Sequence, residues 1–269
     1  MTSEIRQLAP AKVNLTLHVT GQREDGYHLL DSLVAFADFG DDVYVSDGPT
    51  HLSVEGDLAA GVPTGPTNLM WRALDVMGAE ASLRLVKRLP AEAGIGGGSS
   101  DAAAVLRAIG GSTVEQQMSL GADVPVCMLA TAARMRGVGE GVEKVALPPL
   151  PALLVNPRVS MPTPAVFSAM TKRTNAEMPM IPMFEGVADA ADWLATMRND
   201  MQDAAISIQP VIERALSDLQ STRQCLLARM SGSGATCFAI YPTMKAAHFA
   251  AYELGAMHTD WWIRPCTLS

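Results

Sequence analysis

The chain has 269 residues, of which 48% are apolar and 18% are charged, and its formal net charge is −8. This composition is typical of a folded globular protein, and the length is sufficient for two domains of ordinary size. The negative charge argues against a general nucleic-acid-binding protein, because such proteins are usually basic. An acidic protein can still hold phosphate groups through backbone N–H groups, a few cations and a metal ion.

The cysteines are far apart in the sequence and lack the C-x-x-C spacing of zinc sites. They are Cys127, Cys225, Cys237 and Cys266. We therefore expect reduced thiols in apolar surroundings and a cytoplasmic location. No run approaches the roughly 18 consecutive apolar residues of a membrane span, so we expect no membrane partner.

Residues 9–19 alternate between apolar and polar side chains, which predicts a strand. The polar face of this strand carries Lys12, Asn14, Thr16 and His18. The alternation alone indicates a half-solvated strand. A polar turn at 21–28 follows and ends in Tyr27 and His28, so strand and turn together gather side chains suited to a substrate pocket.

The next segment contains further strands over 29–46, with a turn at 40–42, and then turns over 47–66. Thr67 or Asn68 is placed to cap the helix that follows. A strand is predicted at 82–88, directly before a glycine-rich loop.

This loop, residues 90–100, leads into a helix whose apolar residues recur at helical spacing up to Ile109. Ser99 or Ser100 is predicted to cap the helix and Gly110 to end it. The simplest interpretation is a flexible glycine-rich turn. The loop lacks the lysine of a P-loop and matches G-x-G-x-x-G only in part. A triphosphate-binding loop of another design is therefore the best functional interpretation, since its amides would face outward at the positive end of the helix dipole.

Asp123 lies among apolar residues, after a second helix beyond Gly111. One interpretation is that it caps the next turn. The other is that it is ionised and needs a cation, for which Lys12 is the candidate. Residues 134–147 are predicted to form a strand–turn–strand that closes the first domain.

A proline run at 148–151 predicts a boundary between an N-terminal domain, 1–150, and a C-terminal domain, 151–269. The second domain is expected to begin with a strand and a helix near Pro164, followed by a loop or lid at 174–186. Helices are predicted from Asn199 and from Pro210. A second glycine loop at 229–236 precedes a strand, a helix and a last strand, which together are predicted to form a βαβ-like unit.

Three segments, residues 10–14, 90–104 and 231–235, resemble in this order the three signature motifs of the GHMP small-molecule kinases. Residues 20–28 and 120–125 are similar to the branch of that family that acts on a cytidine diphosphate-linked methylerythritol. The segments 162–164 and 229–232 fit the same branch. The resemblance runs from about Pro10 to Tyr241 and so covers nearly the whole chain.

The resemblance implies an α/β (α+β) fold of two domains, with an N-terminal domain like ribosomal protein S5 domain 2 and a ferredoxin-like C-terminal domain. The active site is expected in the cleft between them. The implied activity is ATP-dependent phosphorylation of the 2-hydroxyl of the cytidine diphosphate-linked substrate, with Mg²⁺, in isoprenoid precursor biosynthesis. A monomer or weak homodimer is expected.

The resemblance also assigns roles to residues. Lys12 and Asp123 become the catalytic pair, since an Asp beside the acceptor hydroxyl can take its proton while a lysine keeps that Asp ionised. The implied ATP-binding residues are Pro90, Ala91, Glu92, Ala93, Gly94, Ile95, Gly96, Gly97, Gly98, Ser99, Ser100, Asn68, Ser231 and Gly232. The implied substrate-binding residues are Asn14, Asp25, Tyr27, His28, Thr163 and Phe167.

The sequence departs from the family pattern at Glu92 and Ala93, where small residues are usual, and a glutamate near phosphates is unfavourable unless it points away. The segment between Gly111 and Leu120 is also short. We expect Asp101 to complement the helix dipole rather than to approach the metal. Two alternatives stay open, namely another GHMP kinase (for homoserine, mevalonate or a sugar) and a nucleotide-sensing protein without catalysis.

Overall fold

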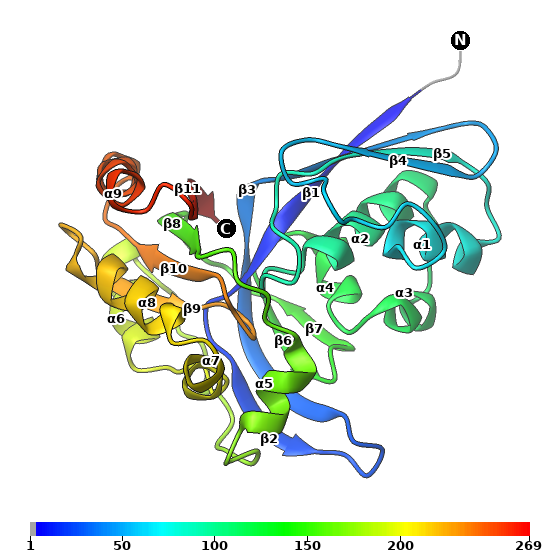
Figure 1. The fold of residues 1–269 in the computed structure, drawn as a ribbon. Helices are drawn as coiled ribbons and strands as arrows, with labels where there is room; N and C mark the ends of the chain where they lie inside the picture. Colours follow the sequence, from blue (N-terminus) through cyan, green and yellow to red (C-terminus); the bar gives the residue numbers. More distant parts are fainter. Residues whose placement is uncertain (1–3) are drawn as a thin grey trace.

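The computed structural model describes residues 4–269, and within them the strands join into one 11-stranded sheet. The main path of the sheet runs β4-β5-β3-β11-β8-β10-β9. Figure 1 shows two halves side by side, one built from the elements up to β7 and the other from β8 onward. The proposed division into 1–150 and 151–269 places all of β1–β7 in the first part.

The strands of the first half are β1 (Ile5–Asn14), β2 (His18–Gln22), β3 (His28–Ser46), β4 (His51–Glu55), β5 (Ser82–Val86), β6 (Ala133–Gly137) and β7 (Gly141–Lys144). The central strand is β3, which pairs antiparallel with β1, β2, β5 and β6. The predicted turn at 40–42 is wrong, because β3 continues through Gly40. A Cβ there would lie 2.1 Å from the carbonyl oxygen of Ala9, so only glycine allows this close approach of β1.

The single strand predicted over 9–19 is also wrong, since β1 ends at Asn14 and β2 begins at His18. The expected half-solvated face is absent as well. Lys12, Asn14, Thr16 and His18 are all buried. Lys12 lies against Asp123 and Gly96 of the first half, whereas Asn14 and Thr16 contact Ser231 and Met178 of the second half.

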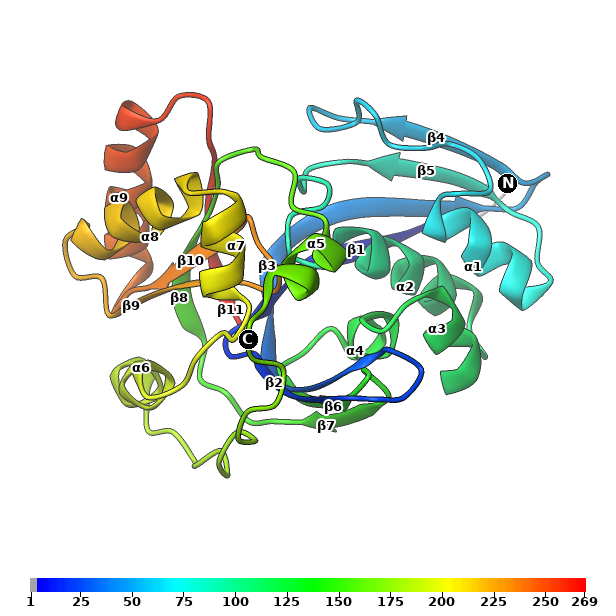
Figure 2. The same cartoon turned by 60° about the horizontal axis from the view of Figure 1, so that its bottom comes forward.

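The helices of the first half are α1 (Leu69–Met77), α2 (Gly97–Ile109), α3 (Val114–Leu120) and α4 (Val124–Leu129). They lie together below the long strands β1 and β3 in Figure 2. Small residues such as Ala102 and Ala103 let α2 pack closely on the sheet, within the buried apolar cluster of the first half. Asn68 caps α1 and Gly110 ends α2, as predicted. The predicted serine cap is wrong, because α2 begins one turn earlier with Gly96 as its N-cap.

The second half contains β8 (Leu150–Asn156), α5 (Thr163–Ala169), α6 (Val187–Ala195), α7 (Gln202–Ile208), α8 (Val211–Ser221), β9 (Leu227–Met230), β10 (Cys237–Ile240), α9 (Met244–Met257) and β11 (Trp262–Leu268). Its strand order is β11-β8-β10-β9, and β8 pairs antiparallel with both β10 and β11. Thus β10 and β11 run parallel and α9 connects them. This confirms the predicted βαβ unit and gives the ferredoxin-like arrangement.

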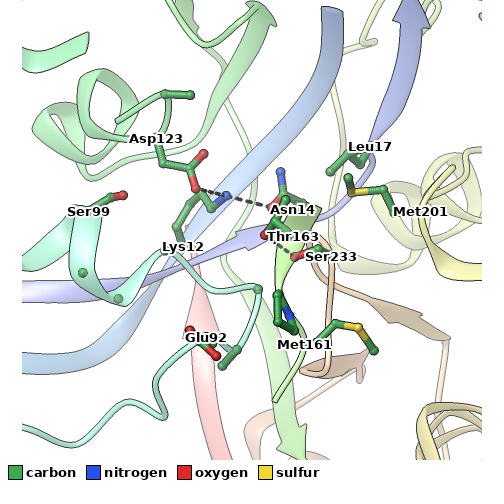
Figure 3. Close-up of a pocket in the computed structure, with 18 of the residues that line it drawn as sticks. Lys12, Asn14, Leu17, Glu92, Ser99, Asp123, Met161, Thr163, Met201 and Ser233 are labelled. Atoms are coloured by element: carbon green, nitrogen blue, oxygen red, sulfur yellow. Dashed lines mark hydrogen bonds and ion pairs between the residues drawn. The ribbon is translucent and has the colours of Figure 1, made fainter. Parts of the chain in front are cut away.

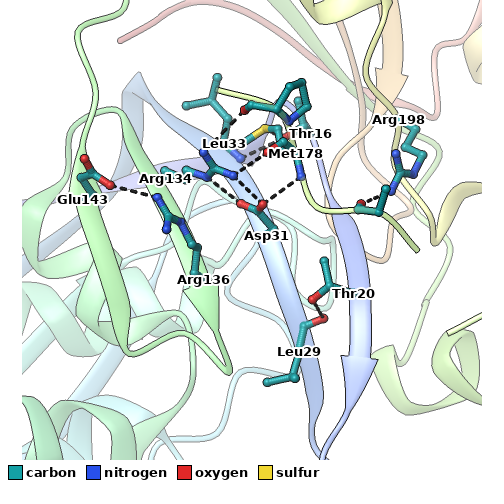
Figure 4. Close-up of polar contacts among 12 residues, drawn as sticks. Thr16, Thr20, Leu29, Asp31, Leu33, Arg134, Arg136, Glu143, Met178 and Arg198 are labelled. Atoms are coloured by element: carbon teal, nitrogen blue, oxygen red, sulfur yellow. Dashed lines mark hydrogen bonds and ion pairs between the residues drawn. The ribbon is translucent and has the colours of Figure 1, made fainter. Parts of the chain in front are cut away.

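Residues 174–186, which we name the strap, contain no helix or strand, and Met178 within the strap contacts β3 and β6 of the first half. The guanidinium of Arg134 donates to both carboxylate oxygens of Asp31, at 2.8 and 2.6 Å, and to the carbonyl oxygen of Met178 at 2.6 Å. The backbone N–H of Met178 donates back to Asp31 at 2.9 Å (Figure 4). A buried ion pair on β3 and β6 therefore fixes the middle of the strap.

The four cysteines are free thiols, as predicted. Burial raises the pKa of each of them, to about 11 for Cys225. In the described part of the chain, no helix combines the length and the apolar character that crossing a membrane requires.

Candidate active site

A cavity of about 610 Å³ lies between the two halves and is lined by residues from both. The first half contributes Lys12, Asn14, Asp123 and residues of the glycine loop, and the second contributes Thr163, Phe167, Gly232 and Ser233 (Figure 3). The cavity therefore occupies the position that the family resemblance predicts for the active site.

Lys12 and Asp123 meet in this cavity, although they are far apart in the sequence. The ammonium of Lys12 donates to Oδ2 of Asp123 and to Oδ1 of Asn14, both at 2.9 Å. The Lys12 side chain is only 5% exposed, whereas that of Asp123 is 30% exposed. Asp123 precedes α4 but makes no capping hydrogen bond, so the capping interpretation is wrong and the predicted pairing with Lys12 is confirmed.

The glycine loop is shaped by positions that only glycine fills easily. Gly94 and Gly96 have φ of 71° and 63°, in the left-handed region. A Cβ on Gly96 would lie 3.3 Å from the side chain of Lys12, and the Lys12 N–H donates to the carbonyl of Ile95 at 2.9 Å. The loop is thus attached to β1 beside the ion pair, and the first turn of α2 opens into the cavity. The N–H groups of a first helical turn have no intrahelical acceptor, so they are available to an anion.

The second glycine loop contacts the first through Ser231. Its hydroxyl donates to the carbonyl of Gly94 at 2.9 Å and accepts from the backbone N–H of Asn14 at 3.0 Å. Ser231 is fully buried, whereas Gly232, with φ of 56°, lines the cavity. A Cβ on Gly94 would lie 2.5 Å from the carbonyl oxygen of Ser231, so the two loops pack backbone against backbone.

Glu92 also lines the cavity, and its carboxylate accepts from the hydroxyl of Ser160 at 2.7 Å. This hydrogen bond turns the carboxylate toward the second half, and Figure 3 shows it apart from the Lys12–Asp123 pair. Its backbone has φ of 48°, a conformation that is uncommon for a residue other than glycine.

Three of the predicted substrate-binding residues line the same cavity, namely Asn14, Thr163 and Phe167. The hydroxyl of Thr163 hydrogen-bonds to that of Ser233 at 2.8 Å. His28 stacks on Phe167, and its Nδ1 is buried without a partner. Burial, and then the charge of Arg173, lower the pKa of His28, so its ring is neutral at pH 7.

Other predicted residues lie elsewhere. Asp25 and Tyr27 line a neighbouring cavity of about 340 Å³, which shares only Ala122 with the first. Asp25 forms an ion pair with Arg23, and the Tyr27 residue is 63% exposed. The amide of Asn68 is used within the fold, because it accepts from Met70 N–H and donates to the Pro63 carbonyl.

Within the glycine loop itself, the cavity is lined by Glu92, Ala93, Gly94, Gly96, Gly97, Gly98 and Ser99. The remaining members are Pro90, Ala91, Ile95 and Ser100. Ile95 is buried among apolar residues such as Leu89 and Ala93. The Ser100 hydroxyl donates to the Pro10 carbonyl. Ile95 and Ser100 therefore hold the shape of the loop and do not face the cavity.

Sequence patterns missed residues that support the site. Asn199 donates from its amide to the carbonyls of Met230 and Gly232 at 2.8 and 2.9 Å, and so holds the second glycine loop. Only its position before a helix could have drawn attention to it. The expectation for Asp101 is wrong, because this residue is buried and paired with Lys87 instead of complementing the helix dipole at the surface.

The donors present suit a magnesium ion carried by a triphosphate. Among residues 4–269 no group of three or more His, Cys, Asp or Glu side chains could hold a metal. The cavity does contain the carboxylate of Asp123 and the residue Ser99. Mg²⁺ commonly keeps several waters and uses one or two carboxylates together with substrate phosphates, so these residues fit it without a dedicated cage.

Comparison with known proteins defines the class. Family models described as "GHMP kinases N terminal domain" and "GHMP kinases C terminal" match residues 68–131 and 183–258. A homoserine kinase structure from Cytophaga hutchinsonii shares the fold, with a TM-score of 0.65 at 15% identity over 99% of this chain and 96% of that one. The chain is thus a member of the GHMP kinases, a class of phosphotransferases that use ATP, and has their fold.

More similar proteins define the family within that class. A crystal structure of a 4-(cytidine 5'-diphospho)-2C-methyl-D-erythritol kinase matches with a TM-score of 0.80 at 33% identity, over 98% of this chain and 99% of that one. The 4-diphosphocytidyl-2-C-methyl-D-erythritol kinase of Dinoroseobacter shibae is 53% identical, over 98% of this chain and 95% of the relative. That of Ruegeria pomeroyi is 47% identical, over 96% and 97%. The chain therefore belongs to the 4-diphosphocytidyl-2-C-methyl-D-erythritol kinase family.

Proposed function

We propose that the chain transfers the γ-phosphoryl group of ATP to the 2-hydroxyl of 4-diphosphocytidyl-2-C-methyl-D-erythritol, in the synthesis of isoprenoid precursors. The names of its relatives support this substrate. The observation that carries the proposal is the ion pair of Lys12 and Asp123, at 2.9 Å, in the same cavity as the glycine loop. An acceptor hydroxyl and a triphosphate can meet there.

In the proposed step, the hydroxyl oxygen attacks the γ-phosphorus and its proton passes to the carboxylate of Asp123. The new O–P bond forms as the bond to ADP breaks. The ammonium of Lys12, which donates to Oδ2 of Asp123 at 2.9 Å, orients the carboxylate and stabilises the negative charge that develops nearby. Asn14 fixes the ammonium, because its Oδ1 accepts from Lys12 while its Nδ2 donates to the Ser32 hydroxyl at 2.8 Å.

The glycine loop binds the triphosphate through backbone N–H groups of Gly96–Ser99 at the start of α2, where the helix dipole favours negative charge. Bound Mg²⁺ would neutralise part of the phosphate charge, and the hydroxyl of Ser99 would help to hold it together with the phosphate oxygens. Glu92 does not oppose the phosphates directly, since Ser160 holds its carboxylate.

The other end of the cavity accepts the cytidine diphosphate part of the substrate. Phe167 offers a flat apolar face, and the neutral ring of His28 lies against it with one unpartnered nitrogen. Thr163 and Ser233 supply hydroxyl groups beside the second glycine loop. Asp25 and Tyr27 line the adjoining cavity, and we propose that they contact the part of the substrate that extends into it.

A direct assay tests the proposal. The purified chain is incubated with ATP, Mg²⁺ and 4-diphosphocytidyl-2-C-methyl-D-erythritol, and the 2-phosphate product is identified by phosphorus NMR. Homoserine and mevalonate serve as alternative acceptors. Phosphorylation of the cytidylyl substrate alone is expected, and turnover of another acceptor without it would overturn the substrate assignment.

We propose further that the protein acts in the cytoplasm as a monomer or weak homodimer. Sedimentation at several concentrations tests the second point, since a weak dimer dissociates on dilution.

A further inference from the structure

A buried ionic cluster lies behind the glycine loop and takes no part in lining the cavity. It consists of Asp41 on β3, Lys87 directly after β5, and Asp101 on α2. The ammonium of Lys87 donates to Oδ2 of Asp41 and to Oδ2 of Asp101, the latter at 2.9 Å. The three side chains are 0%, 5% and 5% exposed, respectively, so one cation is shared by two carboxylates in the interior.

This cluster joins the two ends of the loop. Before the loop, the backbone N–H groups of Arg88 and Leu89 both donate to Oδ1 of Asp41, at 2.5 and 2.8 Å. After the loop, Asp101 lies on the second turn of α2. The residues before the loop are therefore held to Asp41, and Asp41 and Asp101 are both held to the same ammonium group, that of Lys87.

The ammonium also lies close to the proposed phosphate-binding backbone. A Cβ on Gly97, the first residue of α2, would lie 3.4 Å from Nζ of Lys87. Gly97 and Gly98 also line the cavity. The first turn of α2 therefore has the Lys87 ammonium and the cavity as direct neighbours.

A purely structural ion pair would not need this composition. Buried ion pairs can often be replaced by apolar residues without loss of stability, and a second carboxylate adds a further desolvation penalty. Here Oδ1 of Asp101 is buried without a hydrogen-bond partner. The charged groups that face Asp101 are Lys87 and Asp41. A role in holding the glycine loop therefore explains this ionic cluster better than a contribution to stability does.

We propose, building on the kinase function above, that Lys87 is a positioning residue for ATP: together with Asp41 and Asp101 it fixes the spacing of the two ends of the glycine loop, and so directs the loop amides at the triphosphate. It contacts neither substrate, and it acts through the backbone of residues 88–89 and 97–101.

The test compares two variants with a matched control. Lys87→Met leaves two buried carboxylates without a cation, and it risks failing to fold. The double variant Lys87→Met/Asp101→Asn removes one positive and one negative charge and leaves Asp41 with its two backbone donors. Arg134→Met is the control, because it also breaks a buried ion pair of an aspartate on β3, but at the strap and away from the loop.

Three quantities are measured in each protein: KM for ATP, KM for the cytidylyl substrate, and hydrogen exchange of the amides of residues 94–100 without ligand. For the double variant we expect KM for ATP to rise about 10- to 100-fold, since a misplacement of about 1 Å can cost that much. Exchange in the loop should accelerate while KM for the cytidylyl substrate stays within about twofold. Arg134→Met should change neither KM for ATP nor exchange in the loop.

The results separate this inference from the proposed function. Unchanged KM for ATP and unchanged loop exchange in the double variant would overturn the positioning role. The same holds if Arg134→Met raises KM for ATP equally, since the effect would then follow from lost stability. If the wild-type protein lacks kinase activity, the proposed function fails, and exchange of the loop amides still decides the role of Lys87.

Discussion

His28 and Phe167 stack face to face, with ring centroids 4.0 Å apart and planes inclined by 7°. One ring comes from the start of β3 and the other from α5, so the stack joins the two halves of the molecule. Phe167 lines the cavity, whereas His28 does not. Because His28 occupies one face of the Phe167 ring, a flat base that stacks on Phe167 must use the other face or displace His28.

Phe167→Ala tests this end of the cavity. We expect KM for the cytidylyl substrate to rise about tenfold or more, because stacking of a base on an aromatic ring contributes about 1–3 kcal/mol. KM for ATP should change little. Steady-state kinetics with each substrate varied in turn measures both values. Phe249→Ala on the exposed surface of α9 is the control. An unchanged KM for the cytidylyl substrate would show that the base binds elsewhere.

Asp123→Asn keeps the size of the side chain and removes its basicity. We expect kcat to fall by about 10²- to 10⁴-fold, the usual contribution of a positioned proton acceptor, while nucleotide affinity by calorimetry changes little. Lys12→Met should lower kcat as well, because the ammonium holds Asp123 at 2.9 Å. Undiminished turnover by the Asp123 variant would remove the carboxylate from the mechanism.

Gly94→Ala should separate the two glycine loops. The added Cβ would lie 2.5 Å from the Ser231 carbonyl oxygen and 2.7 Å from that of Gly234, at a φ of 71°. The left-handed backbone alone costs about 1–3 kcal/mol for a residue other than glycine, so Tm should fall. Gly255→Ala in α9 meets no atom within 4 Å and should raise stability by about 0.5–1 kcal/mol. Calorimetry compares the two, and equal Tm values would contradict the close loop packing.

Asp101 predicts a pH dependence of stability. Burial, opposed by Lys87 and assisted by Asp41, raises its pKa to about 7 in the folded chain, from an ordinary value of 3.8. The folded state therefore holds a proton that the unfolded state releases, and its contribution to stability is lost as pH rises from about 4 to about 7. Relative to Asp101→Asn, the wild-type free energy of unfolding should fall over this range, by of order 1 kcal/mol per pH unit. Urea denaturation of both proteins at several pH values measures the difference, and parallel curves would contradict a raised pKa.

Much of the site could be predicted from sequence because its residues stand in local motifs. The glycine loop precedes a helix with clear apolar spacing, and Asp123 is an isolated carboxylate among apolar residues, so a cation partner follows from electrostatics. This argument predicted the pairing of Asp123 with Lys12. The order of strands and helices likewise predicted the βαβ unit of the second half.

What could not be predicted depends on contacts between distant segments. Alternation along 9–19 indicated a solvated face, but segments distant in the sequence, such as those of Asp123, Met178 and Ser231, bury both faces. Gly40 signals a turn in isolation, yet here it serves the close approach of β1 to an uninterrupted β3. The cluster around Lys87 brings together a residue of β3, the residue that follows β5 and a residue of α2, and no local pattern indicates that these side chains share one site.

The hydroxyl of Ser231 joins Gly94 of one glycine loop to the backbone of Asn14, and all three residues are in contact across the seam between the halves. A hinge motion at this seam would leave an amide, a hydroxyl and a carbonyl unpaired, at about 1–3 kcal/mol for each buried group. We therefore expect both substrates to enter a preformed site from its open side, with adjustment on binding confined to mobile side chains at the rim.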